Sequence, residues 1–177
     1  ELPCADFSGA DLTDAKLPLA RLERASFEGA TLLQADFEGV AAPGLNLSGA
    51  NLWKAKLRGA MLVGAICEHA NMKAVLACGA VLDEARGSGV SLVVADLAKA
   101  SLKRAELEGA DMLEANLQGT DFSEASLRNA EIAKATLGHM RLTRADLRGL
   151  KGASLEHLSK HCSDLSGAIF DGPHPVT

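Results

Sequence analysis

Residues 95–118 read ADLAK ASLKR AELEG ADMLE ANLQ, with alanine at every fifth position and a large apolar residue two places after each alanine. Five residues of α-helix advance by about 500°, so successive alanines would be displaced by roughly 140° and would share no helix face. A straight strand fails as well, because its side chains alternate with period two and an odd repeat would place successive leucines on opposite faces. The pattern therefore predicts a chain that coils around its own alanines and leucines.

This five-residue register extends from Ala5 to Leu150. Of the 30 positions numbered in multiples of five, 23 are alanine, and none carries a polar residue larger than threonine. Twelve glycines occupy the corner position before an alanine position, where turns often need a positive φ. Of the 29 positions two residues after the alanine position, all but four are Leu, Phe, Met or Ile, and the exceptions are Ala42, Cys67, Ala77 and Gly87.

Segments such as ADFSG (5–9), LNLSG (45–49) and ADLRG (145–149) resemble the A(D/N)LXX repeat of the pentapeptide-repeat family. The resemblance covers about 150 of the 177 residues, and a repeat of this length is a specific signal. It implies an all-β solenoid, a right-handed quadrilateral β-helix with four five-residue sides per coil. About seven to eight coils, stacked at about 4.8 Å, would form a rod of roughly 35 Å with a short C-terminal capping helix.

The charged residues test the number of sides independently. In a coil of 20 residues, outward charges that are 20 apart lie one above the other, where opposite signs attract. Within residues 1–151, 13 opposite-sign pairs and only two like-sign pairs have this separation, whereas a separation of 15 gives five opposite-sign and six like-sign pairs. The charges therefore favour four sides. They predict ion pairs between Glu38 and Arg58, between Glu108 and Arg128, and along the ladder Glu84, Arg104, Glu124, Arg144.

The sequence predicts two parts, a repeat solenoid at 1–152 and a C-terminal cap at 153–177. Residues 154–162 (SLEHLSKHC) predict a short helix that has Ser154 as its N-cap and roofs the last coil. Two repeats in a shifted register follow at 163–172, and a Pro-rich tail ends the chain. At the other end, Leu2 already lies in the core register. We therefore expect either a partner that covers the first coil or a place for this solenoid within a larger protein.

The composition indicates a soluble domain without catalytic chemistry. The net charge is −5, no apolar run approaches the length of a membrane span, and the four cysteines have no disulfide or Cys-x-x-Cys spacing, which favours reduced thiols in the cytoplasm. No nucleophile elbow or phosphate-binding glycine loop is present, so we expect no enzyme activity, no cofactor and no small-molecule substrate. Nucleic-acid binding is disfavoured, because the basic block at 125–151 contains no aromatic residues and is explained by stacking on acidic coils.

One cluster has a spacing suited to a metal ion. His157 and His161 are four residues apart, and Cys162 follows directly. These residue types at this spacing form a candidate ligand set. The favoured interpretation is two solvent-facing histidines on a capping helix, and we expect no metal.

The middle of the chain departs from the regular repeat. Slots that are usually polar hold apolar residues, while the nearby inward positions hold small ones. The favoured interpretation is a thinned core with local bending, and the alternative is a belt that binds a partner. The outward apolar residues are Met61, Val63, Ile66, Leu76 and Val81, and the small inward residues are Cys67, Ala77 and Gly87.

One outward column is apolar where comparable columns are polar. In steps of 20 it reads Thr13, Leu33, Trp53, Lys73, Val93, Leu113 and Ala133, and Ala74 and Val94 widen it. Contiguous apolar surface with an aromatic residue is typical of an interaction site. We predict that this edge, through Leu33, Trp53, Val93 and Leu113, docks a partner protein or a second copy of the chain. The alternative is that Trp53 lies flat over its neighbours and has a structural role.

The most consistent function is therefore a non-catalytic protein-interaction or scaffold module. The resemblance also offers a second function, because some pentapeptide-repeat proteins mimic DNA with an acidic rod and protect gyrase from quinolones. This chain departs from that pattern, since its charges alternate vertically and its C-terminal third is basic.

Overall fold

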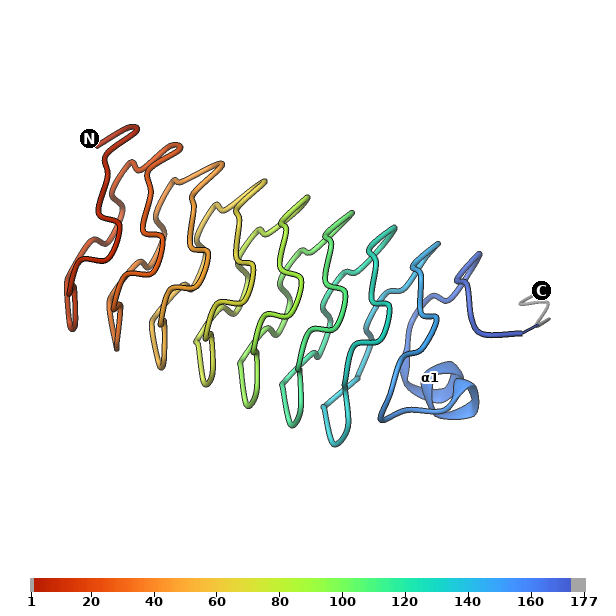
Figure 1. Ribbon diagram of the computed structural model, residues 1–177. Helices are drawn as coiled ribbons and strands as arrows, with labels where there is room; N and C mark the ends of the chain where they lie inside the picture. The colour runs from red at the N-terminus through yellow and green to blue at the C-terminus, as the bar shows by residue number, and fades with distance from the viewer. Residues whose placement is uncertain (1, 173–177) are drawn as a thin grey trace.

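The computed structural model describes residues 2–172, which wind into a stack of coils along one axis (Figure 1). The Pro-rich tail expected after residue 172 lies outside the described residues. Parallel β-bridges join residues that are 20 apart, from Asp6–Ser26 to Glu131–Lys151, and they recur at every fifth residue. Each coil of this stretch therefore has four sides. Every bridge is isolated, so the expected all-β fold consists, among residues 2–172, of single bridges without continuous strands.

Four of the five main-chain N–H groups of a repeat have a fixed main-chain partner. Leu12 and Asp14 donate to the carbonyl oxygens of Thr31 and Leu33 in the next coil, both at 2.8 Å, and Thr31 donates back to Ala10 at 2.9 Å. The N–H of Ala10 closes the turn on Phe7 at 3.0 Å. Because the coils are bonded in both directions, the backbone polar groups of an inner coil are satisfied by its two neighbours.

The fifth N–H explains why Asp and Asn recur in the repeat. The side chain of Asp11 accepts this N–H from Thr13 at 3.1 Å, and the side chain of Asn51 accepts it from Trp53 at 3.3 Å. Where the acceptor side chain is replaced by Lys16 or Ala41, proline, which has no N–H, stands two residues later, at Pro18 and Pro43. The repeat pattern predicts only that these polar slots face solvent. The structure shows that they also close the turn, as an Asx motif does.

Each turn places one residue in the left-handed region. All 30 positions numbered 4, 9, 14 and so on up to 149 have a positive φ, and 12 of them are glycine. The other 18 are occupied by residues with a side chain, for example Lys54 and Glu114. Such residues adopt this conformation at an energetic cost, so the ladder of hydrogen bonds enforces the turn even where glycine is absent.

The core is a continuous stack of the alanine and large apolar positions. From Leu22 to Leu147 nearly all of these side chains are at most 5% exposed. At the N-terminal end Phe7 stacks on Phe27 with ring centroids 4.9 Å apart, and Phe27 meets Phe37 edge to face at 5.7 Å. Phe7 and the other core positions of the first coil are only half-buried, because no described coil lies beneath them.

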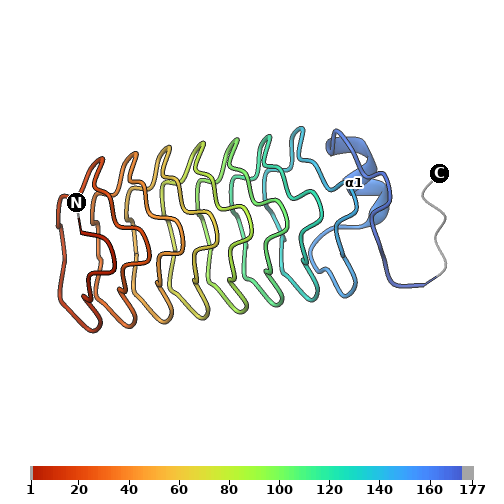
Figure 2. The ribbon, with the colours of Figure 1, turned by 90° about the horizontal axis from the view of Figure 1, so that it is seen from above.

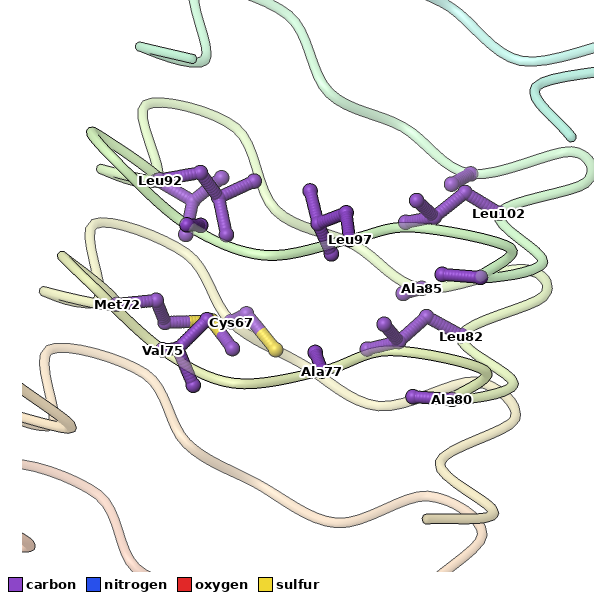
Figure 3. Packing of buried hydrophobic residues seen from close by; sticks show 14 of the residues in the cluster. Cys67, Met72, Val75, Ala77, Ala80, Leu82, Ala85, Leu92, Leu97 and Leu102 are labelled. Atoms are coloured by element: carbon purple, nitrogen blue, oxygen red, sulfur yellow. The ribbon is translucent and has the colours of Figure 1, made fainter. Parts of the chain in front are cut away.

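The core is thinned where the sequence places its small inward residues. An apolar internal cavity of about 20 Å³ lies beside Cys67 and Gly87 and is lined by leucines, including Leu82, Leu97 and Leu107. Figure 3 shows the sparse packing around Cys67, Ala77 and Ala85. Its burial raises the pKa of the Cys67 thiol to about 12, so this thiol stays protonated. The structure thus contains the thinned core that the sequence predicts.

The ladder changes after Lys151. Helix α1 spans Leu155–His161, and the hydroxyl of Ser154, its N-cap, accepts the N–H of His157. The helix lies beside the last coils and Leu158 is buried (Figure 2). The chain then resumes the bridges at Asp164 and at Ile169, each 23 residues after its partner instead of 20, which places the shifted repeats on the existing ladder.

The predicted charge ladder is present in part. Arg58 meets Glu38 at 3.3 Å and Arg104 meets Glu84 at 2.5 Å. The predicted pairs Glu108–Arg128 and Glu124–Arg144 do not appear as ion pairs among residues 2–172. Arg128 instead lies 3.9 Å from Asp146, which is 18 residues away on the adjoining position of the next coil. Long side chains reach either neighbouring column, so the separation of 20 identifies the coil but not every partner.

Candidate interaction edge

The predicted apolar column lies on the turn that joins two sides of the coil. Main-chain bonds hold it in register, because the carbonyl oxygen of Trp53 accepts the N–H of Gln34 at 2.9 Å and Lys54 donates to Lys73 at 3.0 Å. The asparagine bond from Asn51 fixes the same turn from within. Side chains at this position therefore project from a rigid backbone. We call the apolar residues on it, Leu33, Trp53, Val93, Val94 and Leu113, the Trp53 edge.

Exposure differs along the Trp53 edge. Trp53 is 39% exposed and Val94 is 56% exposed, whereas Leu33, Val93 and Leu113 are half-buried. The charged side chain of Lys73 is exposed between Trp53 and Val93 and divides the column into two apolar segments. The edge is therefore apolar over several coils, but it is not one uninterrupted strip.

Trp53 carries a cation on its ring face. The Nζ atom of Lys54 lies 4.3 Å from the ring centroid, which is within the range of a cation–π contact. Such a contact holds the ring in one orientation and leaves part of its surface free. A pre-oriented aromatic side chain loses little conformational entropy on docking, which favours its use as an anchor.

An open hollow lies beside the Trp53 edge. It is lined by Gln34, Lys54, Lys56, Ala74, Leu76 and Val94. The small side chain of Ala74 leaves room between Lys54 and Val94, and the apolar Leu76 stands in a slot that is polar in most repeats. No carboxylate lines the hollow. Its apolar surface and its two lysines suit a partner segment with an apolar side chain flanked by acidic groups.

The sequence reveals the apolar column but not the hollow beside it. A signal for the hollow is present, since Leu76 and Ala74 are both unusual for their slots. Finding it requires aligning the second turn column with the adjoining side of the coil, which brings Lys56 and Leu76 next to Ala74 and Val94.

The metal candidate does not form a ligand set. Within residues 2–172 no three His, Cys, Asp or Glu side chains are placed to share a metal ion. The rings of His157 and His161 contact each other with centroids 4.6 Å apart. Burial raises the pKa of the Cys162 thiol to about 11, which disfavours the thiolate that a metal needs. The spacing of four brings the two histidines together on α1 without completing a site.

The solenoid and its exposed apolar edge define the chain as a repeat protein built for contact with other molecules. The profile of the family described as "Pentapeptide repeats" matches residues 5–40, 44–76, 79–112 and 110–149. The chain therefore belongs to the pentapeptide-repeat family. No helix in the described part of the chain combines the length and apolar character that crossing a bilayer requires.

Solved structures of the same family resemble this one. HetL of the cyanobacterium Nostoc sp. strain PCC 7120, a protein involved in the regulation of heterocyst differentiation, is 30% identical over 95% of this chain and 84% of its own, with a TM-score of 0.43. A trypsin-treated form of QnrB1, a plasmid-mediated fluoroquinolone resistance protein, is 16% identical over 96% of this chain and 91% of its own, with a TM-score of 0.51. A search of curated protein sequences gives no significant match.

Proposed function

We propose that this chain is a non-catalytic protein-interaction module, in which a rigid repeat solenoid presents the Trp53 edge to a partner protein. The observation that carries the proposal is the exposure of Trp53, the only tryptophan of the chain, on a turn whose backbone is fixed in every direction. Tryptophan is the residue type most enriched at the energetic centres of protein interfaces. The half-buried Leu33, Val93 and Leu113 extend the contact surface along the rod.

The hollow beside Trp53 indicates the chemistry of the partner. Lys54 and Lys56 flank an apolar floor of Ala74, Leu76 and Val94. A partner segment with an apolar side chain over Leu76 and carboxylates near the two lysines would bury apolar surface and match the charges. The partner is therefore a protein with an apolar segment bounded by acidic residues.

The repeat register and the family support the fold on which this proposal rests. We infer a right-handed quadrilateral β-helix over residues 1–152 and a cap formed by residues 153–177. Since Cys4, Cys67, Cys78 and Cys162 are free thiols, we place the protein in a reducing compartment such as the cytoplasm.

Gyrase binding by DNA mimicry is the weaker alternative. The likeness to QnrB1 is a likeness of fold at low identity. A DNA mimic needs an extended acidic surface, whereas residues 125–151 carry six basic residues and only two acidic ones. A gyrase supercoiling assay separates the two functions, because a mimic inhibits or protects the enzyme and the proposed module does neither.

Site-specific photo-crosslinking tests the proposed edge directly, because the crosslink forms with whichever protein docks there. A benzoylphenylalanine placed at position 53 is compared with one at position 43, where Pro43 occupies the same turn position at the opposite corner of the coil. The proposal expects a discrete conjugate from position 53 and none from position 43. Equal conjugates from both positions, or none from position 53 in cells that express the protein, would contradict it. A conjugate between two copies would identify the partner as the chain itself.

A further inference from the structure

The bridge ladder stops early on one side of the solenoid. The side that begins at Lys16–Asp36 ends with the bridge between Asn116 and Thr136, and no described residue bridges Thr136 from above. The three other sides continue to Lys151, Asp164 and Ile169. One side of the last coil is therefore missing from the ladder.

Gly152 is where the chain leaves this ladder. Its φ of +86° and its close approach to Ala133 exclude any side chain, since a Cβ atom would clash with the main-chain nitrogen and Cα of Ala133. The chain then turns into α1 and returns only at Asp164. The helix takes the place of the missing side but supplies none of its bridge hydrogen bonds.

Three main-chain groups are left without a hydrogen-bond partner in the described structure. They are the N–H of Lys134, the C=O of Ala135 and the N–H of Leu137, none of which takes part in a bond. Their equivalents one coil earlier are all paired at 2.9 Å. Glu114 donates to Ala133, Thr136 donates to Ala115, and Leu117 donates to Thr136. The unpaired groups thus repeat the donor, acceptor and donor order that an added strand requires.

These groups border an open groove. Its floor is formed by Ile132, Lys134, Ala135 and Leu137, and its wall by Gly152, Ala153, Ser154 and His157. The groove is partly apolar, and its titratable residues are Lys134 and His157, with no carboxylate among them. Lys134 already meets Glu114 of the coil below at 3.1 Å, which shows the contact that an acidic residue in the coil above would repeat.

We propose that this groove binds an extended peptide segment of a partner protein by β-augmentation, parallel to residues 134–137. One guest residue donates its N–H to Ala135 and accepts the N–H of Leu137, and the carbonyl three residues earlier accepts the N–H of Lys134. The main-chain bonds supply affinity and the side chains supply selectivity. An acidic guest residue lies over Lys134, and an apolar residue three positions later lies over Leu137. The groove is a second site, about four coils away from Trp53, and does not depend on the function proposed for the Trp53 edge.

A peptide copied from the side directly below provides a probe with this chemistry. Residues 112–120 (MLEANLQGT) place Glu114 and Leu117 three positions apart, as the groove requires. In the free protein, amide hydrogen exchange followed by NMR should be much faster for Lys134 and Leu137 than for Glu114 and Leu117. Saturation with the capped peptide should slow exchange of Lys134 and Leu137 by at least about tenfold. A peptide N-methylated at its asparagine amide, which cannot donate to Ala135, should bind at least about fivefold more weakly.

Charge reversal provides the matched control. Lys134→Glu should weaken binding of the acidic peptide and strengthen binding of the same peptide with lysine in place of its glutamate, whereas Trp53→Ala should change neither. The proposal is overturned if Leu137 in the free protein is as well protected as Leu117, or if the N-methylated peptide binds equally well. It is also overturned if protection without peptide rises with protein concentration, because a second copy would then fill the groove.

Discussion

The side-chain nitrogen of Lys54 lies 4.3 Å from the centre of the Trp53 ring, so this ring is held at the surface and contributes nothing to the core stack. A partly exposed cation–π contact contributes about 0.5–1 kcal/mol. Trp53→Ala should therefore lower the free energy of unfolding by no more than about 1 kcal/mol, measured by urea denaturation. Leu52→Ala, at a fully buried neighbour, should cost about 2–5 kcal/mol. A similar loss in both variants would show that Trp53 is structural.

Asn116 tests the role of the polar second position of the repeat. Its side chain accepts the N–H of Gln118 at 3.2 Å and donates to Asp96 at 3.0 Å. Asn116→Ala removes both bonds and leaves a turn N–H unpaired, so we expect a loss of about 1–3 kcal/mol in unfolding free energy. Lys56→Ala, in the same column but with no such bond, should change stability by less than about 0.5 kcal/mol. Equal effects of the two substitutions would contradict the turn-closing role of Asn116.

Gly87 tests the thinned core. A Cβ atom at this position would lie 3.0 Å from the end of the Leu107 side chain and 3.4 Å from Val90, and Leu107 borders the cavity into which it can shift. Gly87→Ala should therefore raise the thermal midpoint, with a gain of up to about 1 kcal/mol from a stiffer unfolded chain and a fuller core. Gly59→Ala, at a φ of +62°, should be destabilising. A loss of stability in Gly87→Ala would show that the cavity does not accommodate a methyl group.

Asp164 fastens the returning chain in a pH-dependent way. The hydroxyl of Thr143 donates to its carboxylate at 2.7 Å and the N–H of Ser166 at 2.8 Å, and these bonds lower the pKa of Asp164 to about 2, with a smaller effect of Arg141. A lowered pKa in the folded state means that the stabilisation is present above about pH 4 and is lost as the pH falls to about 2. Amide exchange of residues 164–170 should accelerate over this range.

Asp164→Asn provides the control for this pH dependence. The amide does not titrate, so the variant should show faster exchange of residues 164–170 at neutral pH and a smaller additional change between pH 4 and pH 2. The carboxylates of the other coils titrate in both proteins and cancel in the comparison. An unchanged pH profile in the variant would assign the effect to other groups.

Much of this fold was predictable because one repeat is used about thirty times. The alternation of Ala and Leu defines the inward positions, and the charges define the 20-residue coil. Two features were not predictable from this pattern. The asparagine and aspartate bonds depend on turn geometry, which a solvent-facing slot does not reveal. The choice of Arg128 between Glu108 and Asp146 depends on rotamers of long exposed side chains.

The candidate sites were predictable to different degrees. Trp53 and its column follow directly from counting in steps of 20, whereas the hollow at Ala74 and Leu76 needs the depth of neighbouring columns. The groove above Leu137 arises from the departure of the chain at Gly152, which an intact repeat count conceals until the register shift is placed on the ladder.

The most direct test of the central claim is the dissociation constant of the partner recovered by crosslinking at position 53, measured for the unsubstituted protein, Trp53→Ala and Pro43→Ala by titration calorimetry. If the Trp53 edge is the docking surface, Trp53→Ala should raise the dissociation constant by about 30-fold, equivalent to about 2 kcal/mol, while Pro43→Ala leaves it within about twofold. A dissociation constant unchanged by Trp53→Ala would contradict the claim.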